Sequence, residues 1–359
     1  MIFTSTAFDP EKIVFIPSAL KHLRAFLEGR NCAPEDIFVL TDENTANFCL
    51  PELPDLVHDV PREQLIKIPA GEKSKSLRNA EKIYRLLMER AATRQSLLVN
   101  LGGGVITDLG GFVASTFKRG VSFVHIPTSL MGQVDAAIGG KTAVNLDGIK
   151  NQLGTFSFPE QVLIYTGFLK TLPEEELLSG FAEVIKHALI ADRSYLEYLL
   201  EQDLHNPGTD WETIVKRSVE IKSDIVLQDP YDFGVRRKLN FGHTFGHAIE
   251  TCMQRKGGSV SHGQAVAAGM ICESHLAYLK NMISFTDFGF ILSSIQKFIR
   301  KIIIEADDFD VIFDLMRSDK KNERERINFS LPDRIGNVRI NCEAKPPEIL
   351  ECLSFYKTL

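Results

Sequence analysis

Three histidines and one glutamate in the second half of the chain have the residue types and spacing of metal ligands. His243 and His247 stand four residues apart in FGHTFGH, so a helix would place both on one face. His262 opens the segment HGQAVAAGM, and Glu183 lies in a stretch with helical periodicity. Two histidines and a carboxylate with an open position commonly hold a catalytic divalent ion such as zinc. Spacing alone pairs His243 with His247, and a core or capping role for any one histidine is the competing interpretation.

A run of glycines in the first half predicts a phosphate-binding turn. Gly102, Gly103 and Gly104 follow the apolar run LLVNL and precede a helical pattern. Glycines let a backbone approach a pyrophosphate closely, and the start of a helix offers N–H groups with a favourable dipole. The polar loops TDENT and PAGEKSK, which follow other predicted strands, fit the same nucleotide interpretation. A tight turn and ordinary solvated loops are the alternatives.

Basic residues beside glycines, asparagines and apolar helical patterns predict an anionic substrate. The formal net charge is −6, so these cations stand out from an acidic background. Planar guanidinium groups and lysine ammonium groups are the usual partners of carboxylates and phosphates. Each residue taken alone also fits a solvated surface position. The set comprises Arg119, Lys141, Lys150, Lys186, Lys222, Arg236 and the pair Lys320 and Lys321.

The elements that must position these residues change character along the chain. Short apolar runs alternate with helical patterns in the first half, which predicts a parallel sheet with helices on both faces and ligands at the carboxyl ends of the strands. Strands are predicted at 13–16, 37–40, 65–68, 97–101 and 121–126, and helices near 17–28, 76–92 and 105–116. From residue 171 onward helical periodicity dominates, with helices starting at Pro173 and covering 211–228 and 262–279.

Seven segments between about residue 40 and about residue 340 resemble, in order, the dehydroquinate synthase family. They are GGGVITDLGGFVAST, FKRGVSFVHIPTSLMGQVDAAIGGKTAVN, GIKNQLGTF, LPEEELLSGFAEVIKHALI, RRKLNFGHTFGHAIE, SHGQAVAAGM and DKKN. The resemblance implies an NAD-binding, Rossmann-like α/β domain over residues 1–170. It also implies an all-α domain over residues 171–359 that binds the metal and the substrate.

The resemblance also implies the role of each site residue. The metal, zinc or cobalt, would be held by Glu183, His243 and His262, which replaces the pairing from spacing and leaves His247 beside the substrate. The NAD set comprises Asp42, Asn44, Glu72, Lys75, Gly103, Gly104, Val105, Asp108, Thr128, Ser129, Lys150 and Thr171. The substrate set comprises Asp135, Lys141, Asn151, Lys186, Lys222, Arg236, Asn240, His247 and a lysine of the pair Lys320 and Lys321. Arg119 would reach the phosphate in a neighbouring subunit, which implies a homodimer.

The implied activity is that of a phosphate-eliminating lyase of the shikimate pathway. The enzyme would convert 3-deoxy-D-arabino-heptulosonate 7-phosphate to 3-dehydroquinate and phosphate by transient oxidation with NAD, elimination, re-reduction and aldol cyclisation. Ala136, Ala137 and His187 depart from the commonest pattern of the family, as does DPYDFGVR, and leave the fine tuning of the site open. The alternatives are another sugar-phosphate cyclase of the 2-deoxy-scyllo-inosose synthase type, a metal-dependent polyol dehydrogenase, and an inactive homologue that only binds nucleotide.

Composition argues against several other classes of protein. The 359 residues include 44% hydrophobic and 25% charged residues, a balance typical of globular proteins. The acidic net charge and the lack of a Lys/Arg run argue against a nucleic-acid partner. The most apolar long stretch, 97–114, contains an asparagine, an aspartate and five glycines and does not predict a membrane helix. Six cysteines without a CxxC pair, and an N-terminus unlike a signal peptide, predict a cytoplasmic location.

Overall fold

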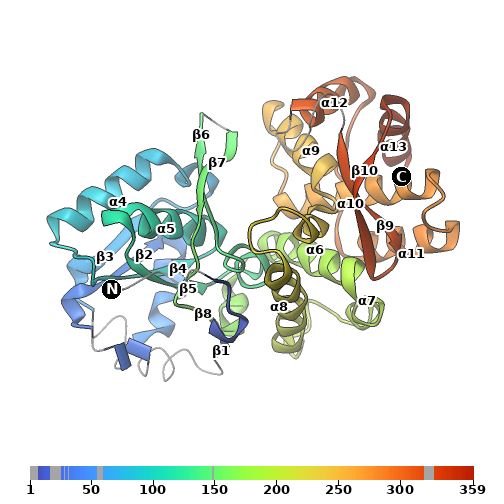
Figure 1. The fold of residues 1–359 in the computed structure, drawn as a ribbon. Helices are drawn as coiled ribbons and strands as arrows, with labels where there is room; N and C mark the ends of the chain where they lie inside the picture. The colour runs from blue at the N-terminus through green and yellow to red at the C-terminus, as the bar shows by residue number, and fades with distance from the viewer. Residues whose placement is uncertain are drawn as a thin grey trace. The chain divides into compact units, whose positions relative to one another are not determined.

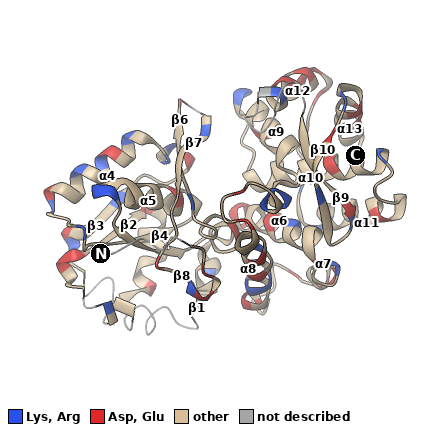
Figure 2. Cartoon of the chain, viewed as in Figure 1, with Lys and Arg blue, Asp and Glu red and all other residues tan. Residues whose placement is uncertain are grey.

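The chain forms two compact units, Met1–Pro173 and Glu174–Leu359 (Figure 1). The computed structural model describes residues 7–16, 26–27, 29–30, 32–54, 60–147, 149–318 and 327–359. Lys and Arg are interspersed with Asp and Glu along the helices of both units (Figure 2). Among the described helices, none combines the length and the apolar character needed to cross a bilayer.

A six-stranded parallel sheet organises the first unit. Its strands lie in the order β1-β8-β5-β4-β2-β3, and every neighbouring pair is parallel. The strands are β1 (Ile13–Phe15), β2 (Ile37–Asp42), β3 (Leu65–Ile68), β4 (Leu97–Gly102), β5 (Ser122–Pro127) and β8 (Gln161–Ile164). The predicted α/β fold is confirmed, and β8 adds a strand that the sequence patterns did not indicate.

Side chains of the central strands alternate between two apolar cores. Phe38, Leu40 and Leu98 join the core that also contains residues of α4 (Leu77–Glu89) and α5 (Gly104–Thr116). Val39 and Val99 join the core on the opposite face. A strand buried on both faces reads as a continuous apolar run, which is why these strands were visible in the sequence. A short helix, α2 (Glu43–Phe48), follows β2 directly.

An antiparallel hairpin extends the first unit between β5 and β8. It consists of β6 (Lys141–Leu146) and β7 (Ile149–Phe156). Several of its residues are exposed or only half-buried, and the segment contains polar residues and a glycine, so its apolar alternation is weak. Two of its residues, Asp147 and Asn151, have left-handed backbone conformations with φ of 50° and 53°.

The second unit is mostly helical, and this confirms the predicted class with one correction. Its helices are α6 (Glu174–Ala191), α7 (Arg193–Leu200), α8 (Trp211–Gln228), α9 (His243–Arg255), α10 (His262–Leu279), α11 (Phe285–Phe298), α12 (Phe309–Ser318) and α13 (Pro346–Thr358). The expected all-α composition is wrong in detail, because β9 (Asn328–Arg334) and β10 (Asn337–Glu343) form an antiparallel hairpin. Pro332 and the polar residues of that stretch interrupt the apolar pattern by which strands are predicted from sequence. Helix α10 packs against α6, α9, α11 and α13 and so lies at the centre of the unit.

Candidate functional site

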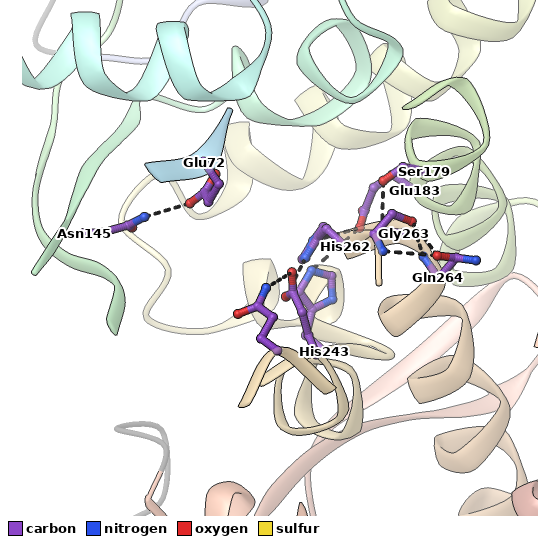
Figure 3. A network of polar contacts seen from close by, with 11 residues as sticks. Glu72, Asn145, Ser179, Glu183, His243, His262, Gly263 and Gln264 are labelled. Carbon is purple, nitrogen blue, oxygen red and sulfur yellow. Dashed lines mark hydrogen bonds and ion pairs between the residues drawn. The ribbon is translucent and has the colours of Figure 1, made fainter. Parts of the chain in front are cut away.

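Glu183, His243 and His262 converge in the second unit although they come from three different helices. Glu183 lies in the middle of α6, while His243 and His262 are the first residues of α9 and α10. Glu183 Oε1 lies 3.7 Å from His243 Nε2 and 3.9 Å from His262 Nε2. Figure 3 shows the three side chains pointing toward one another. The arrangement offers one carboxylate oxygen and two imidazole nitrogens to a common point.

The second nitrogen of each imidazole determines its orientation. His243 Nδ1 lies 3.2 Å from the carbonyl oxygen of Phe241, and His262 Nδ1 lies 3.4 Å from Glu250 Oε2. Carbonyl and carboxylate oxygens accept hydrogen bonds, so each Nδ1 must be the donor. Both rings therefore carry a proton on Nδ1 and turn Nε2 toward Glu183. Metal-binding histidines are commonly oriented in this way.

Glycines bring α9 and α10 into close backbone contact. Gly242 precedes His243 with φ of +83°, a conformation that glycine adopts without strain. A Cβ atom on Gly246 would lie 2.9 Å from the carbonyl oxygen of Ala265, and one on Gly269 would lie 2.7 Å from the backbone nitrogen of Gly246. No larger residue fits at either position without movement of a helix. The glycines therefore fix the distance between the helices that carry the two histidines.

Two hydrogen-bonding contacts hold the helix starts in place. Glu273 on α10 is fully buried, and its carboxylate accepts from the backbone N–H groups of Gly242 at 2.7 Å and Thr244 at 3.1 Å. The N–H of Gly263 donates to Ser179 Oγ on α6 at 3.0 Å, a bond drawn in Figure 3. The first contact joins α9 to α10 and the second joins α10 to α6. All three helices that carry the proposed ligands are thereby tied together.

The Glu183 carboxylate has the environment expected of a metal ligand. It is fully buried, and none of the described residues donates a hydrogen bond of normal geometry to either oxygen. Lys186, one turn further along α6, forms an ion pair with Oε2. Ligand atoms of a tetrahedral zinc site lie about 3.4 Å apart, given metal–ligand distances of about 2.1 Å. The observed separations of 3.7 and 3.9 Å are close to that value, so the residues fit a divalent ion.

His247 lies in the same cluster as the two proposed histidine ligands. Its ring centroid is 5.1 Å from that of His243 and 5.9 Å from that of His262. One nitrogen from each of the three rings lies within 4.8 Å of the others. Both the pairing predicted from spacing and the set implied by resemblance are therefore compatible with this cluster. The buried carboxylate without a normal hydrogen-bond donor favours Glu183 as the anionic ligand.

The other predicted substrate residues of this unit include three buried cations. Lys186, Lys222 and Arg236 have exposed fractions of 1%, 5% and 3%. Lysine and arginine are almost never buried so completely without a partner or a function. Lys222 lies on α8, and Arg236 and Asn240 lie on the 3₁₀-helix Val235–Asn240, which packs against α8 and α6.

The loop before Arg236 is organised by one aspartate. Asp229 accepts hydrogen bonds from the backbone N–H groups of Gly234 at 2.7 Å, Phe233 at 3.0 Å and Arg236 at 3.1 Å. Partial burial acts to raise the pKa of Asp229, but these donors outweigh it and hold the pKa below its ordinary value. Arg236 Nη1 donates to the carbonyl oxygen of Pro230 at 2.6 Å. The loop thus fixes the guanidinium group.

The predicted NAD residues follow the carboxyl ends of the strands in the first unit. Because the strands are parallel, these ends meet at one edge of the sheet, where ligands bind in such folds. The strand β2 ends at Asp42 and is followed by Asn44, and β3 is followed by Glu72 and Lys75. The strand β4 is followed by Gly103, Gly104, Val105 and Asp108, and β5 by Thr128 and Ser129. Thr171 follows β8, and Lys150 lies on β7.

Two residues of different elements, Asp108 of α5 and Asn151 of β7, meet at the buried ammonium group of Lys75. Its Nζ lies 2.5 Å from Asp108 Oδ2 and 2.6 Å from Asn151 Oδ1. Burial raises the pKa of Asp108 above its ordinary value, although Lys75 acts to lower it. Asn145 Nδ2 also donates to Glu72 Oε1 at 2.8 Å. The hairpin β6–β7 is thereby fastened to the loop after β3 and to the start of α5.

The glycine turn is packed as closely as its sequence predicted. A Cβ atom on Gly103 would lie 3.0 Å from Ser129 Oγ, and one on Gly104 would lie 3.2 Å from the Cβ of Ala136. The N–H of Thr128 donates to the carbonyl oxygen of Gly102 at 3.1 Å. Asp42 accepts from the N–H of Thr45 at 2.9 Å and so caps α2. This capping role explains part of the reason for an aspartate at position 42, independently of nucleotide binding.

Five predicted residues remain to be placed. Asp135 lies half-buried in the short π-helical segment Gly132–Ala136, and Lys141 is an exposed residue at the start of β6. Arg119 is exposed after α5 with φ of +68°. Lys320 and Lys321 lie outside the described residues.

The structure reveals two buried glutamates at the site that the sequence patterns did not single out. Glu250 stands seven residues after His243, and Glu273 stands eleven residues after His262. These separations are close to two and three helical turns, so each glutamate lies on the same helix face as a proposed ligand. A search for buried acids at those intervals would have found both.

Two family models match most of the chain. The model of the 3-dehydroquinate synthase N-terminal domain matches residues 65–179, and that of the C-terminal domain matches residues 180–322. A 3-dehydroquinate synthase of Parabacteroides distasonis is 39% identical over 351 residues, which are 97% of this chain and 98% of the relative. The activity in these names is the one predicted from the sequence.

Solved structures of sugar-phosphate cyclases share the fold. A 2-epi-5-epi-valiolone synthase from Streptomyces hygroscopicus, with NAD+ and Zn2+ bound, has a TM-score of 0.81 and 25% identity over 100% of this chain and 99% of that one. A 2-deoxy-scyllo-inosose synthase with carbaglucose-6-phosphate, NAD+ and Co2+ has a TM-score of 0.79 and 20% identity over 96% of each chain. These proteins contain the pair of cofactors that the sequence predicted. With both family models matched and a relative of 39% identity along nearly its whole length, the chain belongs to the 3-dehydroquinate synthase family.

Proposed function

We propose that the chain converts 3-deoxy-D-arabino-heptulosonate 7-phosphate to 3-dehydroquinate and phosphate, as a lyase that depends on NAD and a divalent metal. The convergence of Glu183, His243 and His262 carries this proposal, because it supplies a metal site within a chain of this family. In this proposal residues 1–170 bind NAD, and residues 171–359 bind the metal and substrate groups.

The proposed metal residues are oriented toward one another. Both histidines already carry their proton on Nδ1, and Glu183 already faces both Nε2 atoms. When bound, a zinc or cobalt ion would polarise substrate hydroxyl groups, and NAD would accept a hydride and return it. Lys186 forms an ion pair with Glu183, so its ammonium group lies beside the metal residues, where it would contact the substrate.

The substrate's negative charges account for the buried cations. A phosphate and a carboxylate need charged hydrogen-bond donors, and Lys186, Lys222 and Arg236 supply them from buried positions with restricted motion. His247 stands beside the ligand histidines and would hydrogen-bond the substrate. In the first unit, Lys141, Asp135 and Asn151 complete the proposed substrate set, as does a lysine of the 320–321 pair.

The glycine turn and its surrounding loops account for NAD. The N-terminus of α5 begins at Gly104 and would receive the pyrophosphate, while the polar residues after β2 and β3 would bind the rest of the nucleotide. Arg119 is exposed and is proposed to reach a neighbouring subunit, which makes the working form a homodimer.

Phosphate release tests the proposal. Purified protein is mixed with 3-deoxy-D-arabino-heptulosonate 7-phosphate, with and without NAD and after treatment with a chelator. We expect release that requires both NAD and metal and leaves no net NADH. Release from another sugar phosphate instead would identify a different cyclase, and net NADH formed from glycerol would identify a polyol dehydrogenase. No release with NAD and metal supplied would contradict the proposal.

A further inference from the structure

We propose that Glu250 is a positioning residue of the metal site, which holds the His262 ring through Nδ1 and keeps Nε2 turned toward Glu183. This inference rests on the metal site of the proposed function and adds a residue to it. Glu250 lies on α9, whereas His262 begins α10, so the contact also links the two helices that carry the histidine ligands.

The direction of the hydrogen bond follows from its chemistry. An ionised carboxylate has no proton to donate, so the 3.4 Å contact between His262 Nδ1 and Glu250 Oε2 requires the proton on Nδ1. The distance is at the long end of the range for such a bond. His262 Nε2, on the other side of the ring, then lies 3.9 Å from Glu183 Oε1. Without the carboxylate the ring could rotate or carry its proton on Nε2, and either change would remove a ligand.

Burial makes the contact costly to lose. The exposed fraction of Glu250 is only 4%, and a buried carboxylate depends on the hydrogen bonds that it accepts. The bond from His262 Nδ1 is one of these, so the contact constrains both side chains.

The two histidines differ in their partners, which makes the inference specific. His243 donates to the neutral carbonyl oxygen of Phe241, and His262 to a carboxylate. A carboxylate partner increases the basicity of an imidazole ligand more than a carbonyl partner does. The contact with Glu250 therefore strengthens His262 as a metal ligand.

Metal binding by Glu250 variants tests the inference without relying on turnover. Zn2+ affinity is measured by competition with a chromophoric chelator, and the absorption spectrum of the Co2+-loaded protein reports the ligand field. Removal of such a partner typically weakens metal binding by roughly 10–100-fold. We expect a loss of this size in Glu250→Ala and a smaller loss in Glu250→Gln, which keeps an acceptor oxygen, with a shifted Co2+ spectrum in both.

A control that perturbs the far end of α9 from another element, the 3₁₀-helix Ala306–Asp308, separates positioning from general loosening. Asp308 is a buried acid that pairs with Lys256, near the other end of α9, at 2.8 Å. Asp308→Asn should lower thermal stability while Zn2+ affinity and the Co2+ spectrum stay unchanged. Wild-type affinity and spectrum in Glu250→Ala would overturn the inference, as would an equal loss of affinity in Asp308→Asn.

The remaining outcomes are also decisive. If Glu250→Ala does not fold, Glu250→Gln becomes the test. Wild-type Zn2+ affinity and Co2+ spectrum in that variant would overturn the inference. A loss of Zn2+ affinity in a folded Glu250→Gln protein would support it. Phosphate release is assayed on the same preparations. Wild-type protein that binds Zn2+ but releases no phosphate would overturn the proposed function and leave the result on Glu250 standing.

Discussion

Replacing Gly269 with alanine should separate α9 from α10 and thereby weaken the metal site. A Cβ atom at this position would lie 2.7 Å from the backbone nitrogen of Gly246 and would overlap the carbonyl oxygen of Gly242. Ordinary contacts of carbon begin at about 3.5 Å, so the helices must separate by at least about 0.8 Å. Both obstructing atoms are backbone atoms, one in α9 and one in the residue just before it, so no side-chain rotation can relieve the clash.

The expected effect is large because metal sites tolerate little displacement. Distances in a working site agree with the ideal values to within about 0.2 Å, and His243 moves with α9. We expect Gly269→Ala to lose most of its Zn2+ affinity. Overpacking of this kind typically destabilises a protein by about 1–3 kcal/mol, and the backbone clash favours the upper end.

Gly289 provides a matched control for the same chemical change. It lies in α11, and a Cβ atom there would meet nothing within 4 Å. Alanine in a helix interior is favoured over glycine by about 0.5–1 kcal/mol, so Gly289→Ala should unfold at a slightly higher urea concentration with unchanged Zn2+ affinity. Urea denaturation and chelator competition on both variants check the expectation. Wild-type stability and affinity in Gly269→Ala would refute the argument from helix contact.

Three further expectations concern the ligands, the substrate cations and the first unit. Glu183→Ala should lose bound metal, and retention of one metal ion per chain would exclude Glu183 as a ligand. Lys222→Ala should lower turnover while metal content, measured by atomic absorption, stays normal, and loss of metal would contradict its placement with the substrate. Burial lowers the pKa of His125 to about 3 from an unfolded value of about 6.5, so the unfolded chain binds the extra proton between those values. Stability should therefore fall as pH drops below 6.5, by about 2 kcal/mol at pH 5, and His125→Gln should remove that dependence in urea titrations at pH 7 and pH 5.

The sequence could predict those parts of the fold in which local pattern and burial agree. The strands β2, β4 and β5 are buried on both faces and appear as apolar runs, and α8 and α10 match their predicted ranges, 211–228 and 262–279. The hairpins β6–β7 and β9–β10 escaped prediction for two reasons. The strands β6, β7 and β10 are only partly buried and contain polar residues, whereas β9 is mostly buried but contains Pro332. Their pairing depends on tertiary contacts, such as the bond from Asn145 to Glu72, that no local pattern contains.

The candidate site was predictable to a similar extent. The i, i+4 spacing of His243 and His247 placed two rings on one helix face, and the structure places both in one cluster. Sequence spacing could not predict that Glu183 and His262 join this cluster, because each lies on a different helix from His243. The distances among α6, α9 and α10 depend on contacts such as Gly269 with Gly246 and Gly263 with Ser179, which join residues far apart in the sequence.

The positions of the two histidines create an electrostatic problem that the helix starts resolve differently. The N-terminus of a helix carries a partial positive charge, which disfavours a nearby cation. At α9 the buried carboxylate of Glu273 accepts from the first N–H groups and offsets this charge. At α10 the first N–H groups donate to the neutral hydroxyls of Ser179 and Ser261, so the positive end persists beside His262. The carboxylate of Glu250 contacts His262 on that side, and its negative charge offsets the helix dipole of α10 as that of Glu273 offsets the dipole of α9. One buried glutamate for each helix start therefore allows a cation to bind where two helix dipoles alone would favour an anion.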